Sequence, residues 1–169
     1  MGPMTQARAR KAYRLGMIAV MVAAVPAGTA LAQSSQPTNI GAWKLNVAKS
    51  TYTPGSMPRS STIRYEVVGA RVRVSVDTVT ADGTVAHSVY TTSYDGKECP
   101  ITGTNTSADV TVVTRVDAYT TRRINKSGGK TTITQTAVVS KDGRTLTVTS
   151  KGKSATGLVV DSTAVYDRR

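Results

Sequence analysis

Cysteine, histidine and tryptophan each occur only once in the 169 residues, as Cys99, His87 and Trp43. A single cysteine excludes an internal disulfide, so burial and hydrogen bonding have to stabilise the fold. Metal sites usually take two or more His or Cys ligands, and a serine or cysteine nucleophile needs a histidine positioned by a carboxylate. We therefore expect no cofactor, no metal and no enzymatic activity. His87 is expected to point inward as a packed core residue.

Aromatic residues make up 5% of the chain, which is few for a protein that stacks on nucleotide bases. The cations stand singly along the sequence rather than in clusters, so we expect no nucleic-acid partner. Lysine and arginine nevertheless outnumber aspartate and glutamate by 22 to 10. This excess favours either a solvated basic surface or contact with an anionic surface of the cell envelope.

Long hydrophobic runs are also scarce. Leu15 to Val25 is an apolar run of eleven residues, whereas a membrane-spanning helix needs about 20. Cations without an acid precede this run, and the small residues Ala30 and Ala32 follow it, which is typical of a signal peptide. The cations are Arg8, Arg10, Lys11 and Arg14. We predict a signal peptide over residues 1–32, cleavage after Ala32, and export to the periplasm or beyond without a transmembrane segment.

The rest of the chain is rich in valine and threonine that alternate with other residues, as in half-buried strands. Short turns such as Gly69-Ala70 and Asp82-Gly83 supply the positive φ angles of tight hairpins. After a flexible leader at 33–39, we predict one all-β domain over 40–169, with ten strands in an antiparallel meander. The strands are expected at 42–47, 61–68, 71–79, 84–94, 98–103, 109–116, 120–127, 130–140, 144–151 and 158–167.

A sheet of ten strands must split or close, because an open sheet exposes long edges. Closure into an up-and-down barrel or flattened clam is the simplest solution. The alternation places Ile63 and Tyr65 on the inner face. Over 130–151, threonines oppose the apolar positions, so they line either an exposed face or a polar cavity. The connection 48–60 is expected to cover a mouth of the barrel.

Two adjacent arginines, Arg122 and Arg123, are the most informative polar residues. Neighbouring residues of a regular strand point to opposite faces, so one guanidinium has to point inward. A buried arginine is costly without an anion, which makes the inward one a candidate anchor for a ligand carboxylate or phosphate. The alternative is a bulge or strand end at which both reach water. The pattern does not decide which arginine points inward.

Tyrosines supply the other candidates for a ligand site, because each combines a flat apolar ring with a hydroxyl group. The same residues are also compatible with a plain aromatic core. The candidates are Tyr65, Tyr90, Tyr94 and Tyr166.

The segment GAWKLNVAKSTYTPG, with its Gly-x-Trp at Gly41 to Trp43, resembles the opening of lipocalin-like and fatty-acid-binding-like barrels. The segments VVSKDGRTLTVTSKG and STAVYDRR resemble their last three strands, and YDGKECPITG is typical of small exported bacterial proteins of lipocalin-like character with no settled activity. The resemblance implies a barrel whose tryptophan packs across the closed end. Fatty-acid binders hold the ligand carboxylate with two arginines and a tyrosine. Here Tyr166 is present, but Ala164 and Val138 replace the arginines.

These features predict a non-catalytic, exported protein that binds a small apolar or amphipathic ligand. The binding residues are expected to be Tyr65, Tyr90, Tyr166 and one of the two arginines. The alternative is a basic envelope-associated structural or interaction module with a filled core and no ligand cavity. Salt distinguishes the two, because attachment to an anionic surface weakens with ionic strength.

Overall fold

The computed structural model describes residues 37–53 and 55–169. The predicted signal peptide, its cleavage site and residues 33–36 of the predicted leader lie outside the described residues. Within them the chain is all-β, apart from one 3-10 turn, η1 (Val47–Lys49). The strands are β1 (Gly41–Leu45), β2 (Ser60–Val68), β3 (Arg71–Val79), β4 (Val85–Thr92), β5 (Asp95–Pro100), β6 (Thr102–Thr104), β7 (Val110–Arg115), β8 (Thr120–Ser127), β9 (Lys130–Val139), β10 (Thr145–Lys153) and β11 (Val159–Arg168).

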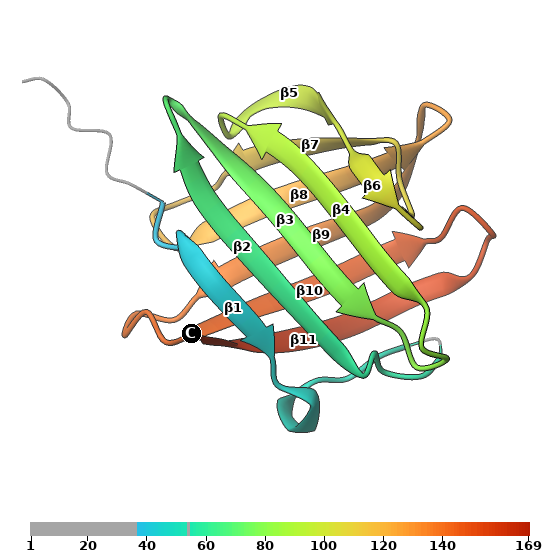
Figure 1. The fold of residues 1–169 in the computed structure, drawn as a ribbon. Coiled ribbons are helices and arrows are strands. Elements are labelled where there is room, and N and C mark those ends of the chain that lie inside the picture. Colours follow the sequence, from blue (N-terminus) through green and yellow to red (C-terminus); the bar gives the residue numbers. More distant parts are fainter. Residues whose placement is uncertain (1–36, 54) are drawn as a thin grey trace, which may run out of the picture. The chain divides into compact units, whose positions relative to one another are not determined.

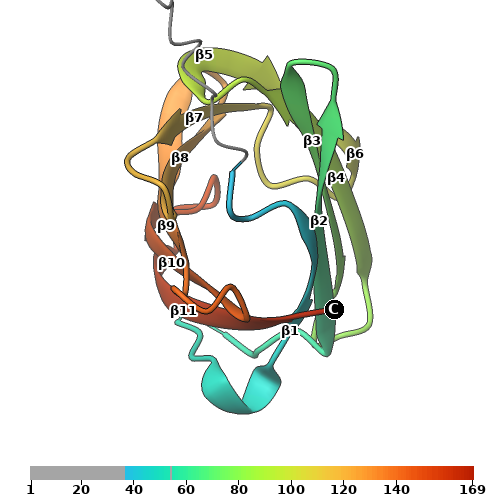
Figure 2. The ribbon, with the colours of Figure 1, turned by 90° about the vertical axis from the view of Figure 1, so that its left-hand side faces the viewer.

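The strands form a single antiparallel 11-stranded sheet that curls into a nearly closed barrel (Figure 1). The order is β5-β7-β8-β9-β10-β11-β1-β2-β3-β4-β6, so the first strand pairs with the last. Trp43 is the register partner of Arg168 on β11 and of Ile63 on β2. Seen from the side, the two halves of the sheet enclose an interior (Figure 2). The predicted single barrel is confirmed.

The two ends of the sheet meet at a seam between β5 and β6, where the prediction of one strand and a plain meander was wrong. β5 pairs with β7, whereas β6 crosses to the other side and pairs with β4. Ile101 alone separates the two strands. Gly103 permits the crossing because its φ is 140° and an added Cβ there would lie 1.9 Å from the backbone oxygen of His87. Alternation alone does not reveal such a close backbone approach.

Alternation fixes the inner face of the barrel. Trp43 and Leu146 are fully buried, and inward positions from most strands complete the core. The threonines that alternate with the inward-facing Gln135, Ala137 and Val148 lie on the outer face. They are Thr132, Thr134 and Thr136 of β9 and Thr145, Thr147 and Thr149 of β10. Of the two alternatives for these threonines, the exposed face is therefore correct.

One end of the barrel is closed around Trp43. The indole Nε1–H donates a 2.7 Å hydrogen bond to the backbone oxygen of Asn39, which is itself 3% exposed. Arg168 donates to the backbone oxygens of Thr38 and Ile40, and Thr38 donates to Ala118 on the far side. Residues of the predicted leader thus cross this end of the barrel and contact it.

Candidate ligand-binding cavity

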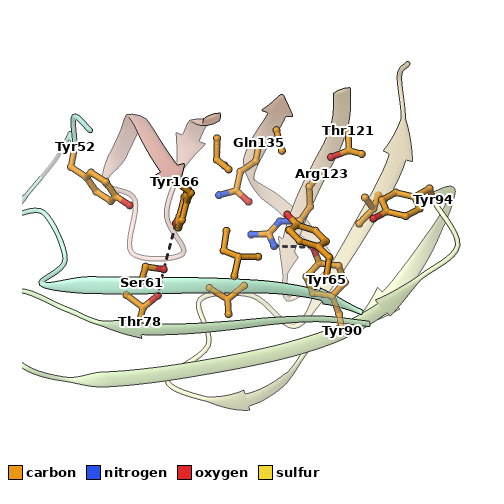
Figure 3. A pocket seen from close by; sticks show the side chains of 15 residues that line it. Tyr52, Ser61, Tyr65, Thr78, Tyr90, Tyr94, Thr121, Arg123, Gln135 and Tyr166 are labelled. Carbon is orange, nitrogen blue, oxygen red and sulfur yellow. Dashed lines mark hydrogen bonds between the residues drawn. The ribbon is translucent and has the colours of Figure 1, made fainter. Parts of the chain in front are cut away.

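The barrel interior contains a cavity of about 200 Å³, which we call the tyrosine cavity (Figure 3). Five of the seven tyrosines of the chain line it, together with one arginine and one glutamine. Among its described lining residues there is no histidine, cysteine, lysine or carboxylate. The lining residues are Tyr52, Ser61, Ile63, Tyr65, Val76, Thr78, Tyr90, Tyr94, Val113, Thr121, Arg123, Gln135, Ala137, Val148 and Tyr166.

Regular alternation along β8 separates the two adjacent arginines. Arg123 points into the barrel, beside its register partners Val113 and Gln135, which also line the cavity. Arg122 lies on the outer face and is exposed. The bulge that would have let both side chains reach water lies further along, between Ile124 and Lys126. Of the two candidates, only Arg123 is part of the cavity.

Arg123 is a cation without a counter-charge in the described part of the chain. Its Nη1 donates a 3.2 Å hydrogen bond to the Tyr90 hydroxyl, and the guanidinium carbon lies 5.4 Å from the centroid of that ring. Its Nε is buried and has no hydrogen-bond partner among the described residues. None of the ion pairs between described residues includes Arg123. A guanidinium stays protonated at any ordinary pH, so the cavity holds a fixed positive charge.

The three tyrosines proposed from the sequence are all buried in the cavity wall. Tyr65, Tyr90 and Tyr166 are between 5% and 8% exposed. The Tyr166 hydroxyl donates a 3.4 Å hydrogen bond to the Ser61 hydroxyl. Burial raises the pKa of Tyr65 and of Tyr166, because an ionised phenolate loses its hydration there. At neutral pH these phenols remain uncharged and can donate as well as accept hydrogen bonds.

Tyr94 lies at the end of the cavity nearest Asn39. Its hydroxyl donates a 3.3 Å hydrogen bond to Asn39 Oδ1, and the Arg115 guanidinium lies 5.4 Å from the ring centroid. Burial raises the pKa of Tyr94 to about 12. Its φ of 58° is in the left-handed region, which is uncommon for a residue other than glycine.

Tyr52 and Gln135 are among the cavity residues that sequence reasoning missed. Tyr52 lies in the 48–60 connection, whose neighbouring residues Thr51 and Thr53 form backbone hydrogen bonds with β11. These bonds align the connection like a strand and turn Tyr52 inward, where burial raises its pKa. Gln135 donates a 2.9 Å hydrogen bond to Ser150. The position of Gln135 on the apolar face of β9 was the signal that could have identified it.

A second cavity of about 240 Å³ lies behind the seam, and we call it the polar cavity. It shares four lining residues with the tyrosine cavity, which are Val76, Thr78, Tyr90 and Arg123. The hydrogen-bonded pair of Tyr90 and Arg123 therefore stands at the boundary between the two cavities. Its remaining wall includes Ile101 at the seam and several polar residues. These polar residues are His87, Ser88, Asn105, Thr106, Ser107 and Asn125.

His87 was expected to point inward, and this prediction is wrong. It is paired with Asp77 across β3 and β4 on the outer face, and its side chain is 43% exposed. His87 Nδ1 and Arg64 both hydrogen-bond the Asp77 carboxylate, at 2.6 and 2.7 Å. The hydrogen bond from His87 is the main cause that lowers the pKa of Asp77. Within the described residues no three His, Cys, Asp or Glu side chains gather as a metal site.

In comparisons with known proteins, no family model and no curated protein matches the chain. None of the helices in the described residues is long and apolar enough to cross a membrane.

Proposed function

We propose that this chain is an exported, lipocalin-like protein that binds a small amphipathic molecule in the interior of its barrel without chemical conversion. The observation that carries the proposal is Arg123, a permanently charged side chain that lines the tyrosine cavity and has no carboxylate partner among the described residues. Placing such a charge inside is costly unless an anion compensates it. A ligand carboxylate or phosphate supplies that anion.

The chemistry of the cavity wall supports binding rather than catalysis. Its polar groups are phenols, small hydroxyls, one amide and one guanidinium. A hydroxyl nucleophile needs a base to remove its proton, and the described lining offers neither a histidine nor a carboxylate. The same groups, arranged around an apolar wall of Ile63, Val76 and Val148, suit recognition of one polar group on an otherwise apolar molecule.

The alternative of a basic module with a filled interior receives less support. It requires a packed core, and a cavity of about 200 Å³ beside Arg123 does not meet that requirement. An excess of cations on the outer strands is compatible with both proposals. Contact with an anionic envelope surface is therefore the alternative that the experiment below can reveal.

Native mass spectrometry of the purified protein tests the proposal, with a panel of fatty acids, shorter amphipathic acids and their neutral amides. We expect one acid to be retained per chain and Arg123→Gln to abolish retention. Arg122→Gln is the matched control, because it removes the same charge from the adjacent residue on the outer face. Protein that stays empty with every compound contradicts the proposal. Attachment to anionic vesicles that both variants weaken, and that salt removes, supports the envelope alternative instead.

A further inference from the structure

We infer that the ligand class of the tyrosine cavity is a small aromatic monocarboxylate rather than a long-chain fatty acid. The inference rests on the proposed function and narrows it to one chemical class. Three properties of the cavity carry it: its volume, its walls and the position of its single charge.

The first property is size. The tyrosine cavity has a volume of about 200 Å³. Pockets that hold drug-sized ligands usually measure about 300–1,000 Å³. Beyond Arg123 lies the polar cavity of about 240 Å³, whose wall is mostly polar. The core around both cavities includes Trp43 and Leu146, which are fully buried. A chain of many methylene groups does not fit the tyrosine cavity without displacing the core or entering the polar cavity, whereas a single substituted ring does.

The second property is the shape and polarity of the walls. Tyr65, Tyr90 and Tyr166 face the cavity from β2, β4 and β11, and Tyr52 and Tyr94 lie toward its two ends (Figure 3). Flat rings on several sides favour a planar ligand, because aromatic pairs attract each other in offset or edge-to-face arrangements. The raised pKa values of Tyr65 and Tyr166 keep these phenols neutral, so they do not repel an anion.

The third property is the charge. The planar guanidinium of Arg123 matches the geometry of a carboxylate, and its unpartnered buried Nε is a donor available to such a group. One cation compensates one negative charge, which favours a monoanion over a dianion. Since Arg123 stands at the boundary with the polar cavity, the carboxylate is expected there and the ring on the tyrosine side.

Isothermal titration calorimetry with four probes tests the ligand class: benzoate, cyclohexanecarboxylate, benzamide and hexadecanoate. We expect benzoate to bind about three- to tenfold more tightly than its saturated analogue, the size expected of an aromatic pair. Benzamide should bind more than about tenfold more weakly, because it lacks the charge that faces Arg123. Hexadecanoate should show no saturable binding inside the barrel.

A filled cavity provides the matching structural test. Ala137→Leu adds volume to the lining of the tyrosine cavity and should weaken benzoate binding at least about tenfold, while Thr136→Leu on the outer face should not. Thermal unfolding of both variants shows whether they fold. The comparison of the four probes uses the parent protein, so it remains valid even if a variant does not fold. Equal affinity for benzoate and its saturated analogue, or tighter binding of hexadecanoate, overturns this inference and leaves the proposed function standing. If none of the probes binds, the inference fails, and the lipid panel above decides separately whether the proposed function survives.

Discussion

Arg168 lies over the indole ring of Trp43, with its guanidinium carbon 4.3 Å from the ring centroid. The same guanidinium donates hydrogen bonds of 2.8 and 2.9 Å to the backbone oxygens of Ile40 and Thr38. One side chain at the end of β11 therefore holds both the tryptophan of β1 and the segment that precedes it. This relationship accounts for the closed end of the barrel.

Substitution of Trp43 should destabilise the fold more than substitution of Arg168. We expect Trp43→Ala to lower the free energy of unfolding by about 3–5 kcal/mol, because it leaves a large cavity in the core. Arg168→Ala should cost about 1–3 kcal/mol through the lost ring contact and hydrogen bonds. Urea denaturation followed by far-ultraviolet circular dichroism measures both. Arg169→Ala, an exposed neighbour, is the control and should stay within about 0.5 kcal/mol of the parent; equal stability of the two arginine variants would contradict the assigned role.

Alkaline pH should destabilise the protein through Tyr94. Burial raises its folded-state pKa from 10.0 to about 12. A group with a raised folded pKa contributes full stability below its unfolded pKa and loses it as the pH rises through the folded value. The free energy of unfolding should therefore fall between about pH 10 and pH 12 less steeply in Tyr94→Phe than in the parent protein. Tyr119→Phe at an exposed turn should retain the parent slope, and identical slopes for all three proteins would refute the prediction.

Asp77 should titrate abnormally because of His87. The hydrogen bond from His87 is the largest cause that lowers the Asp77 pKa, ahead of the one from Arg64. We expect His87→Ala to raise the Asp77 pKa toward its ordinary value, as measured by carbon NMR of the carboxyl group. The lowered pKa means that any stability from this pair is present at neutral pH and is lost as the pH falls through the folded value. Because both side chains are nearly half exposed, the titration is the sensitive readout. An unchanged Asp77 pKa in the variant would disprove the contact.

Gly103 should be indispensable for the seam. A Cβ at this position would lie 1.9 Å from the His87 backbone oxygen, so Gly103→Ala should separate β6 from β4. We expect a loss of more than about 1 kcal/mol and faster hydrogen exchange in β6. Gly129→Ala is the matched control, because its φ of 75° imposes similar strain while no other atom lies within 4 Å. Similar exchange in β6 of both variants would show that backbone strain, not the close approach, matters.

Much of the architecture could be predicted from period-two alternation. That pattern placed Ile63 and Tyr65 inside, and the need to remove exposed edges predicted that the first strand meets the last. It also predicted that Arg122 and Arg123 point to opposite faces. Alternation does not identify the inner face where the neighbouring residues are threonines. Only the packing of β8 in the sheet shows that Arg123, and not Arg122, points inward.

The errors arose where the backbone departs from a regular ladder. The seam depends on a close approach at Gly103, and the inward turn of Tyr52 depends on hydrogen bonds to β11 from a connection that contains prolines. His87 was placed inside because it shares a face with Val85 and Val89. Val85 is 62% exposed, so this valine-bearing face is the outer one and the inference from apolar neighbours failed.

The seam between β5 and β6 is a place where the barrel can open locally at a low cost in free energy. β5 and β6 are each held by a ladder on one side only, and Ile101, which connects them, lines the polar cavity. Fraying of these two terminal ladders would admit a small molecule as far as Arg123 while the hydrogen bonds of every other strand pair stay intact. Entry of the proposed ligand by this route would require only a local opening of the sheet, whereas a fully hydrogen-bonded barrel would have to unfold globally.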